Sequence, residues 1–232
     1  MFTLIWFGFM GLLCGVVLPQ MWLRAARSTR EALSAEPEYR RPTAAEASYV
    51  KALDRQQARV SALSAQGFEL LGDLALVIKS SGRTHVVIRV LVDARKTTCA
   101  CVASVAGHGI TIFESYSDTQ ELVTSHARSD NYIEAGPTSE RQFVHARTPT
   151  ADAYRKHLEL AANATVTLAT LDDVSDAMRA AHNRMIAWRE TQPPDTLLDA
   201  DLRRMLGRAQ YRAFGWWLTK RLQTLPRASV RR

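Results

Sequence analysis

The sequence has only three cysteines and lacks every short motif that would name an enzyme class. It has no glycine-rich phosphate loop, no Gly-x-Ser-x-Gly elbow and no His-Glu-x-x-His helix. Cys99 and Cys101 stand two apart in a predicted strand, so they share a face with Cα atoms about 6.5–7 Å apart, too far for comfortable bridging. The sequence therefore argues against a disulfide scaffold and favours a reducing compartment, and it identifies no catalytic residue, cofactor or metal ligand.

Charged side chains are absent from residues 2–23. At a helical rise of about 1.5 Å per residue this run spans roughly 33 Å, enough to cross a hydrocarbon core of about 30 Å. No small-residue cleavage site follows the run, and the residue before Cys14 is too large for a lipoprotein cleavage box. We therefore predict a retained transmembrane anchor over residues 1–23, with Trp6 and Trp22 near its two interfaces.

Positive charge is missing before this anchor, apart from the amino terminus, whereas Arg24, Arg27 and Arg30 follow it directly. The positive-inside rule places the carboxyl side of such a helix in the cytoplasm. We expect a single-pass protein of the cell inner membrane with its amino terminus outside and its carboxyl-terminal domain in the cytoplasm. The lipid bilayer is then its first predicted partner.

The remaining composition, with 47% hydrophobic and 23% charged residues, is typical of a globular chain. We predict a juxtamembrane linker over 24–43, an α+β globular domain over 44–200 and a basic helical tail over 201–232. Acidic residues are nearly absent from the tail, where nine arginines and lysines accompany only Asp201. The tail carries a charge of +8, so residues 1–200 sum to −1, and the overall charge of +7 is a property of the tail.

The period of the apolar residues changes along the predicted domain. Residues 44–66 have a helical pattern that Gly67 closes, and period-two alternation follows. Connections of three or four residues are too short for parallel crossovers, so we predict an antiparallel β-meander of about five to six strands. The predicted strands are 70–79, 84–93, 97–106, 110–117, 121–127 and 141–146.

Helical patterns return after the strands. We predict helices over 151–162, from a capping sequence at Thr170 to about residue 190, and near 197–208 and 210–225. Strands flanked by helices indicate one sheet covered on one face by helices. Asp172 and Asp173 are interpreted as complementing the dipole of the helix that follows them.

Several histidines fall in the β region together with Cys99 and Cys101, but none has a recognised metal-binding spacing. The Gly107-His108-Gly109 segment favours a hairpin turn over a ligand loop. A metal site assembled across neighbouring strands remains an alternative to scattered polar positions. The histidines concerned are His85, His108, His126 and His145.

The tail is the surface with the most distinctive character. Taken as a helix, residues 211–225 place Arg212, Trp216 and Lys220 on one face, with Arg221 beside them. This arrangement suits an anionic lipid surface, and the alternative is a terminal helix packed on the domain. Because the anchor tethers the tail beside the membrane, the sequence favours lipid over nucleic acid as its polyanionic partner.

The segment Phe113-Glu-Ser-Tyr-Ser-Asp-Thr-Gln-Glu-Leu-Val-Thr-Ser125 and the helix containing Tyr154-Arg-Lys-His157 resemble parts of uncharacterised bacterial single-pass membrane proteins. Those proteins have a short N-terminal anchor and a cytoplasmic α+β domain, and the resemblance covers residues 65–190. Thr119 stands where such proteins often have glycine. The resemblance implies a fold and no activity.

Two functions follow as hypotheses. The first is a membrane-anchored protein whose cytoplasmic domain serves as an interaction or scaffold module for an unknown protein partner. The alternative is a ligand-binding or enzymatic domain with a site on the β-meander. Converging polar groups would favour the alternative, and an exposed apolar or charged patch would favour the scaffold.

Overall fold

The structure is a computed structural model that describes residues 37–43, 46, 57–78, 83–105, 108–126, 136–145 and 147–193. The unit considered below is formed by Ala35–Ser129 and Ala135–Thr191. The predicted anchor, the helices predicted beyond residue 194 and the basic tail lie outside the described residues. Within the described part of the chain, no helix combines the length and the apolar character needed to cross a membrane.

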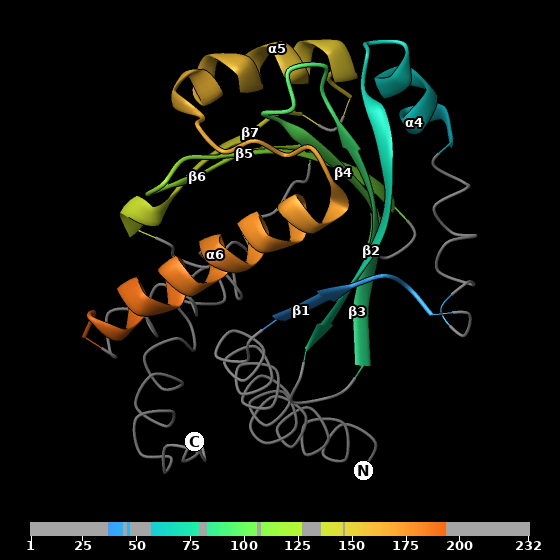
Figure 1. The fold of residues 1–232 in the computed structure, drawn as a ribbon. Helices are drawn as coiled ribbons and strands as arrows, with labels where there is room; N and C mark the ends of the chain where they lie inside the picture. The colour runs from blue at the N-terminus through green and yellow to red at the C-terminus, as the bar shows by residue number, and fades with distance from the viewer. Residues whose placement is uncertain are drawn as a thin grey trace, which may run out of the picture. The chain divides into compact units, whose positions relative to one another are not determined.

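A seven-stranded sheet forms the centre of the unit, and its strands follow one another in sequence order (Figure 1). The strands are β1 (Pro37–Arg40), β2 (Glu69–Ile78), β3 (Arg83–Val92), β4 (Cys99–Val105), β5 (His108–Tyr116), β6 (Glu121–Ser125) and β7 (Ser139–Phe143). Neighbouring strands from β1 to β6 are antiparallel. The predicted α+β class and the six predicted strands are confirmed.

The first strand, β1, lies within the segment that the sequence assigned to the linker. It pairs with the second half of β2, from Ala75 to Ile78. Tyr39 packs against the core, and the Arg40 guanidinium donates hydrogen bonds of 2.8 and 2.9 Å to the two carboxylate oxygens of Glu46. Four residues are too few to show a period in the sequence, so their neighbours in the sheet decide their conformation.

The last strand, β7, differs from the predicted meander because it runs parallel to β6. A long connection separates the two strands, and it ends in the short helix η3 (Gly136–Thr138). Such a connection is long enough to return the chain to the start of β6 before the next strand begins. Gly136 has a positive φ of 53°, and a Cβ atom there would overlap the indole ring of Trp188.

Helices cover both faces of the sheet, so the prediction of helices on one face was wrong (Figure 1). One face carries α6 (Leu171–Glu190), and the other carries α4 (Gln57–Ser64) and α5 (Thr150–Leu160), which continues into η4 (Ala161–Asn163). The predicted capping sequence is confirmed: the Thr170 side chain accepts from the Asp173 backbone, and the Asp173 carboxylate accepts from the Thr170 backbone. Gly67, at φ 87°, follows α4 as predicted.

The physical reason for two covered faces lies in the central strands, which are apolar on both sides. Val90 and Val92 pack on the α6 side of β3, while Leu91 between them packs on the α4 and α5 side. In β4, Ala100 likewise belongs to the second core. Strands buried on both faces appear in a sequence as nearly continuous apolar runs, and period-two alternation describes only one of their faces.

Candidate functional site

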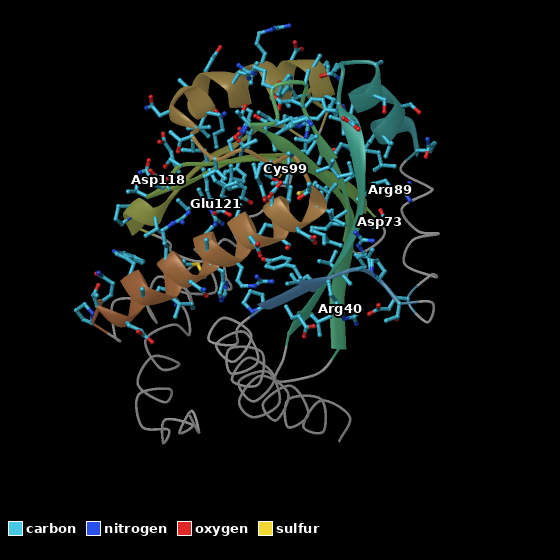
Figure 2. All side chains as sticks on the ribbon, viewed as in Figure 1. Arg40, Asp73, Arg89, Cys99, Asp118 and Glu121 are labelled. Carbon is cyan, nitrogen blue, oxygen red and sulfur yellow. The ribbon has the colours of Figure 1, made fainter. Side chains whose placement is uncertain are left out.

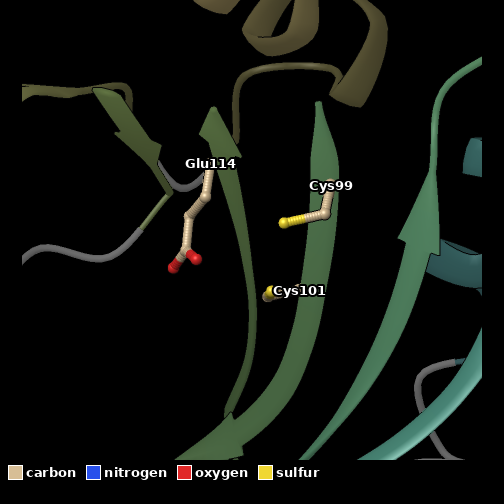
Figure 3. A group of neighbouring side chains, drawn as sticks. All are labelled: Cys99, Cys101 and Glu114. Atoms are coloured by element: carbon tan, nitrogen blue, oxygen red, sulfur yellow. The ribbon is translucent and has the colours of Figure 1, made fainter. Parts of the chain in front are cut away.

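Two groups of polar side chains are buried against the sheet, one on each face of β4 and β5. The first lies on the α6 side and contains Cys99, Cys101 and Glu114 (Figure 3). Figure 2 shows Cys99 and, farther along the sheet, Glu121 on this side. We call Cys99, Cys101 and Glu114 the thiol–carboxylate cluster.

The sheet register creates this cluster. Cys99 of β4 stands directly opposite Glu114 of β5, and Cys101 lies two residues farther along β4 on the same face. The two Sγ atoms and one carboxylate oxygen all lie within 4.8 Å of one another. Cys99 and Cys101 are 0% and 2% exposed, and Glu114 is partly buried. The prediction that the two cysteines share a face is confirmed, and both are free thiols.

Neighbouring side chains orient the acidic groups of this face. The Tyr116 hydroxyl donates a 2.5 Å hydrogen bond to Glu114 Oε2. On the next strand, Glu121 Oε2 accepts from Arg141 and from Ser139, each at 2.8 Å. Glu121 thus has a cationic hydrogen-bond partner, whereas Glu114, among the described residues, accepts a hydrogen bond from a neutral phenol.

Burial changes the proton affinity of the whole cluster. Desolvation, followed by the nearby Glu121 charge, raises the pKa of Glu114 to about 7, against smaller lowering effects of Tyr116 and Arg141. The hydrogen bond with Cys101 lowers the pKa of Cys99, but burial and Glu114 outweigh it, so the net change is upward. The hydrogen bond with Cys99 and then burial raise the pKa of Cys101. Both cysteines are therefore protonated thiols at neutral pH.

The second group, on the α5 side, is a continuous chain of hydrogen bonds around His157. His157 Nε2 lies 3.0 Å from the Ser115 hydroxyl, and its Nδ1 lies 3.0 Å from the Thr124 hydroxyl. Ser115 also shares a 2.9 Å hydrogen bond with Thr98, and Gln142 donates to Thr124 at 2.7 Å. We call this set the histidine network.

The histidine network contains a serine–histidine pair at the distance of a nucleophile and its base, but it is sealed. Ser115, Thr124 and His157 are each 0% exposed. A hydroxyl, not a carboxylate, orients the histidine, and desolvation lowers the pKa of His157 to about 4, so the ring is neutral. The network can hold α5 on the sheet, but substrate cannot reach it.

Asp93 completes the attachment of α5. Its Oδ1 accepts from the backbone nitrogens of Thr97 and Thr98 at 3.0 and 3.1 Å, which fixes the turn before β4. Its Oδ2 accepts from the Tyr154 hydroxyl of α5 at 2.8 Å. This buried acid therefore has partners for both carboxylate oxygens and serves packing.

Of the four histidines identified in the sequence, the side chains of His85 and His108 lie outside the described part of the chain, and the two that are described, His126 and His145, do not form a common site. His126 is buried and contacts the carbonyl oxygens of Thr111 and Thr148, and burial lowers its pKa. His145 is exposed, and its ring accepts from the Arg147 backbone. Val105 pairs with His108, so β4 and β5 form a hairpin, but His108 and Gly109 belong to β5 and not to the turn predicted at residues 107–109.

The other predicted contacts lie elsewhere. Asp172 and Asp173 begin α6 as predicted. The anchor flanks and the proposed lipid contacts lie outside the described residues; they are Trp6, Trp22, Arg24, Arg27, Arg30, Arg212, Trp216, Lys220 and Arg221.

Sequence reasoning missed the role of Glu114 in the site. The available signal was a charged residue at the centre of the predicted strand 110–117, together with a Cys-x-Cys pair one strand earlier. Only the strand register brings the two together. Comparisons with protein-family models, curated proteins and solved structures find no match to this chain.

Proposed function

We propose that this chain is a membrane-tethered ligand-binding protein whose site lies on the α6 side of the β-meander. The observation that carries the proposal is the position of Glu114, a partly buried carboxylate directly opposite a core thiol. Packing alone does not require an acid there, because an apolar side chain would fill the position without desolvating a charge. A ligand that brings positive charge or hydrogen-bond donors offsets this cost.

The tether is proposed from the sequence. Residues 2–23 carry no charge, and Arg24, Arg27 and Arg30 follow them, which favours an inner-membrane anchor and a cytoplasmic domain. The charge of the tail, with Arg212, Trp216 and Lys220 on one predicted helical face, favours a second contact with anionic lipid. The proposed anchor and the proposed lipid contact both concern the location of the ligand-binding domain at the membrane.

An interaction or scaffold module is the competing proposal. Surfaces that bind proteins usually contain a contiguous apolar patch. In the described part of the chain, the large hydrophobic side chains that are exposed are Leu70 of β2 and Phe143 of β7. Four strands separate these two side chains in the sheet, so they do not form one contiguous patch. The thiol–carboxylate cluster is therefore the stronger observation, and it favours ligand binding.

Binding is proposed in preference to catalysis because the pair that most resembles catalytic machinery is sealed. Ser115 and His157 have the distance of a nucleophile and base but are both fully buried under α5. Catalysis needs its reacting groups to reach substrate. The thiol–carboxylate cluster offers ligand atoms without such a pair.

The test is native mass spectrometry of the full chain purified from membranes in mild detergent. We expect the wild type to retain a ligand mass that Glu114→Gln loses. Glu140→Gln, at an exposed glutamate of β7, is the matched control and should keep it. Absence of any ligand mass, together with a stoichiometric protein partner that both variants retain, would support the scaffold instead.

A further inference from the structure

The chemistry of the thiol–carboxylate cluster indicates which ligand it takes. Two thiols and one carboxylate are a ligand set that zinc uses in proteins, as thiolates and a carboxylate. They come from two paired strands inside a hydrogen-bonded sheet, so the backbone holds them in place without a ligand. The two cysteines stand on one strand with one residue between them, which disfavours a disulfide and leaves both sulfur atoms for a common partner.

The distances suit a small cation. Bond lengths of about 2.3 Å to sulfur and about 2.0–2.2 Å to oxygen place tetrahedral ligand atoms roughly 3.5–3.8 Å apart. The two Sγ atoms and the carboxylate oxygen already lie within 4.8 Å of one another. Rotation of three side chains about their own torsions is enough to close a difference of about 1 Å.

The surroundings resemble the outer shell of a metal site. Tyr116 donates to Glu114 Oε2 and so orients the carboxylate, as outer-shell partners of metal ligands do. Arg141 pairs with Glu121 at 2.8 Å, so the neighbouring acid is compensated and does not compete for the cation. Met178, Val174 and Ala181 of α6 belong to the same cluster of buried residues as the two cysteines and give it apolar neighbours from that helix.

We propose that Cys99, Cys101 and Glu114 bind one thiophilic divalent cation of the zinc class, through both Sγ atoms and one carboxylate oxygen. The inference rests on the proposed function, since it names the ligand of that same site. On binding, each thiol loses its proton to solvent as its sulfur–metal bond forms, the Glu114 carboxyl likewise releases to solvent any proton it carries, and no group is oxidised or reduced. Two thiolates, one carboxylate and the cation leave one negative charge, which lies near the Arg141–Glu121 pair.

The experiment is a titration of the reduced, metal-free full chain in detergent with Co²⁺, whose thiolate complexes have characteristic charge-transfer absorption. We expect one equivalent to produce this absorption and Zn²⁺ to abolish it by displacement. Cys99→Ser and Cys101→Ser should each lose the absorption, and Glu114→Gln should weaken Co²⁺ binding by at least about 10-fold. Circular dichroism checks that each variant retains its fold.

Two controls sharpen the titration. Cys14→Ser removes the remaining thiol, and Glu140→Gln removes an exposed acid of β7; both should bind Co²⁺ as the wild type does. Tyr116→Phe keeps every proposed ligand and removes only the hydrogen bond to Glu114, so it should weaken binding by about 10-fold.

The outcomes separate this inference from the proposed function. A folded wild type that gives no thiolate absorption, or an absorption that survives in both cysteine variants, overturns the metal site. If such a protein still retains an organic ligand that Glu114→Gln loses, the ligand-binding function stands and only the metal inference fails. If it retains neither, both fail.

Discussion

Glu114 and Ser115 are adjacent in β5, yet their side chains face opposite sides of the sheet and have opposite surroundings. Ser115 enters the histidine network, in which each hydroxyl and ring nitrogen has a described partner. Glu114 enters a face of thiols, aromatic rings and another acid, and it accepts its hydrogen bond from a neutral phenol. Buried polar groups that satisfy one another stabilise a fold, whereas an acid whose burial outweighs the favourable effects of its neighbours is a cost that a ligand can offset. The comparison assigns stability to the α5 side and binding to the α6 side.

The largest expected effect comes from breaking the histidine network. His157→Ala removes a fully buried ring and leaves a cavity between Ser115 and Thr124, so we expect a loss of about 3–4 kcal/mol in the free energy of unfolding. Urea denaturation of the full chain in detergent, followed by circular dichroism, measures it. His145→Ala, at an exposed histidine, should change the same quantity by less than about 0.5 kcal/mol. Equal effects of the two variants would refute the structural role of the network.

The pH dependence of stability gives a second test of the structural role of the histidine network. His157 has its pKa lowered from the ordinary 6.5 to about 4 in the folded chain, so the folded state binds fewer protons than the unfolded state between these values. Stability contributed by this group is complete above pH 6.5 and is lost as the pH falls toward 4, by about 3 kcal/mol. The difference between wild type and His157→Gln across this range isolates the contribution. A difference that does not change with pH would contradict it.

The contribution of Glu114 to stability is predicted to change with pH in the direction opposite to that of His157. Its pKa is raised from 4.5 to about 7, so its protonated form is favoured in the folded state and its contribution is lost as the pH rises through 7. In the metal-free chain, Glu114→Gln should therefore raise the free energy of unfolding at pH 8 by about 1–2 kcal/mol, with partial exposure reducing the effect. At pH 4 the gain should vanish. Urea denaturation at both pH values tests this, and a destabilised variant at pH 8 would show that the carboxylate serves packing.

The smallest effect is expected for an ion pair that belongs to neither group. Arg89 and Asp73 face each other across β3 and β2 with their charged atoms 3.1 Å apart. The pair is partly solvated, so Asp73→Asn should cost less than about 1 kcal/mol. Thermal denaturation gives the comparison with His157→Ala, and a cost as large as that of the histidine variant would remove the distinction between packed networks and ordinary pairs.

The elements that sequence reasoning found are those with local causes. Thr170 and Asp173 predict the start of α6 because a capping box is contained within four residues, and Gly67 marks the end of α4 by its own conformation. The elements it missed depend on distant partners. β1 is too short to show a period, β7 is parallel because of where a long connection returns, and the second helical layer follows from strands apolar on both faces.

Only part of the candidate site could be predicted from the sequence, because its other part depends on a residue of a neighbouring strand. The Cys-x-Cys pair and its shared face can be read from the alternation of β4. The opposing acid is Glu114 because the register of the β4–β5 hairpin pairs it with Cys99, and a shift of one residue would put it on the other face. The register between two strands is set by the turn that joins them and by packing against both helical layers. The periodicity within one strand therefore does not predict it.

The central claim is that the two faces of one strand pair have separate roles, and zinc-dependent stabilisation tests it most directly. The measurement is the unfolding temperature of the full chain, with and without a small excess of Zn²⁺, for the wild type, Cys101→Ser and Ser115→Ala. A ligand that binds only the folded state raises this temperature. We predict that zinc raises it equally for the wild type and for Ser115→Ala, although the latter starts lower, and leaves Cys101→Ser unchanged. A zinc effect that persists in Cys101→Ser, or that disappears in a folded Ser115→Ala, would contradict the separation.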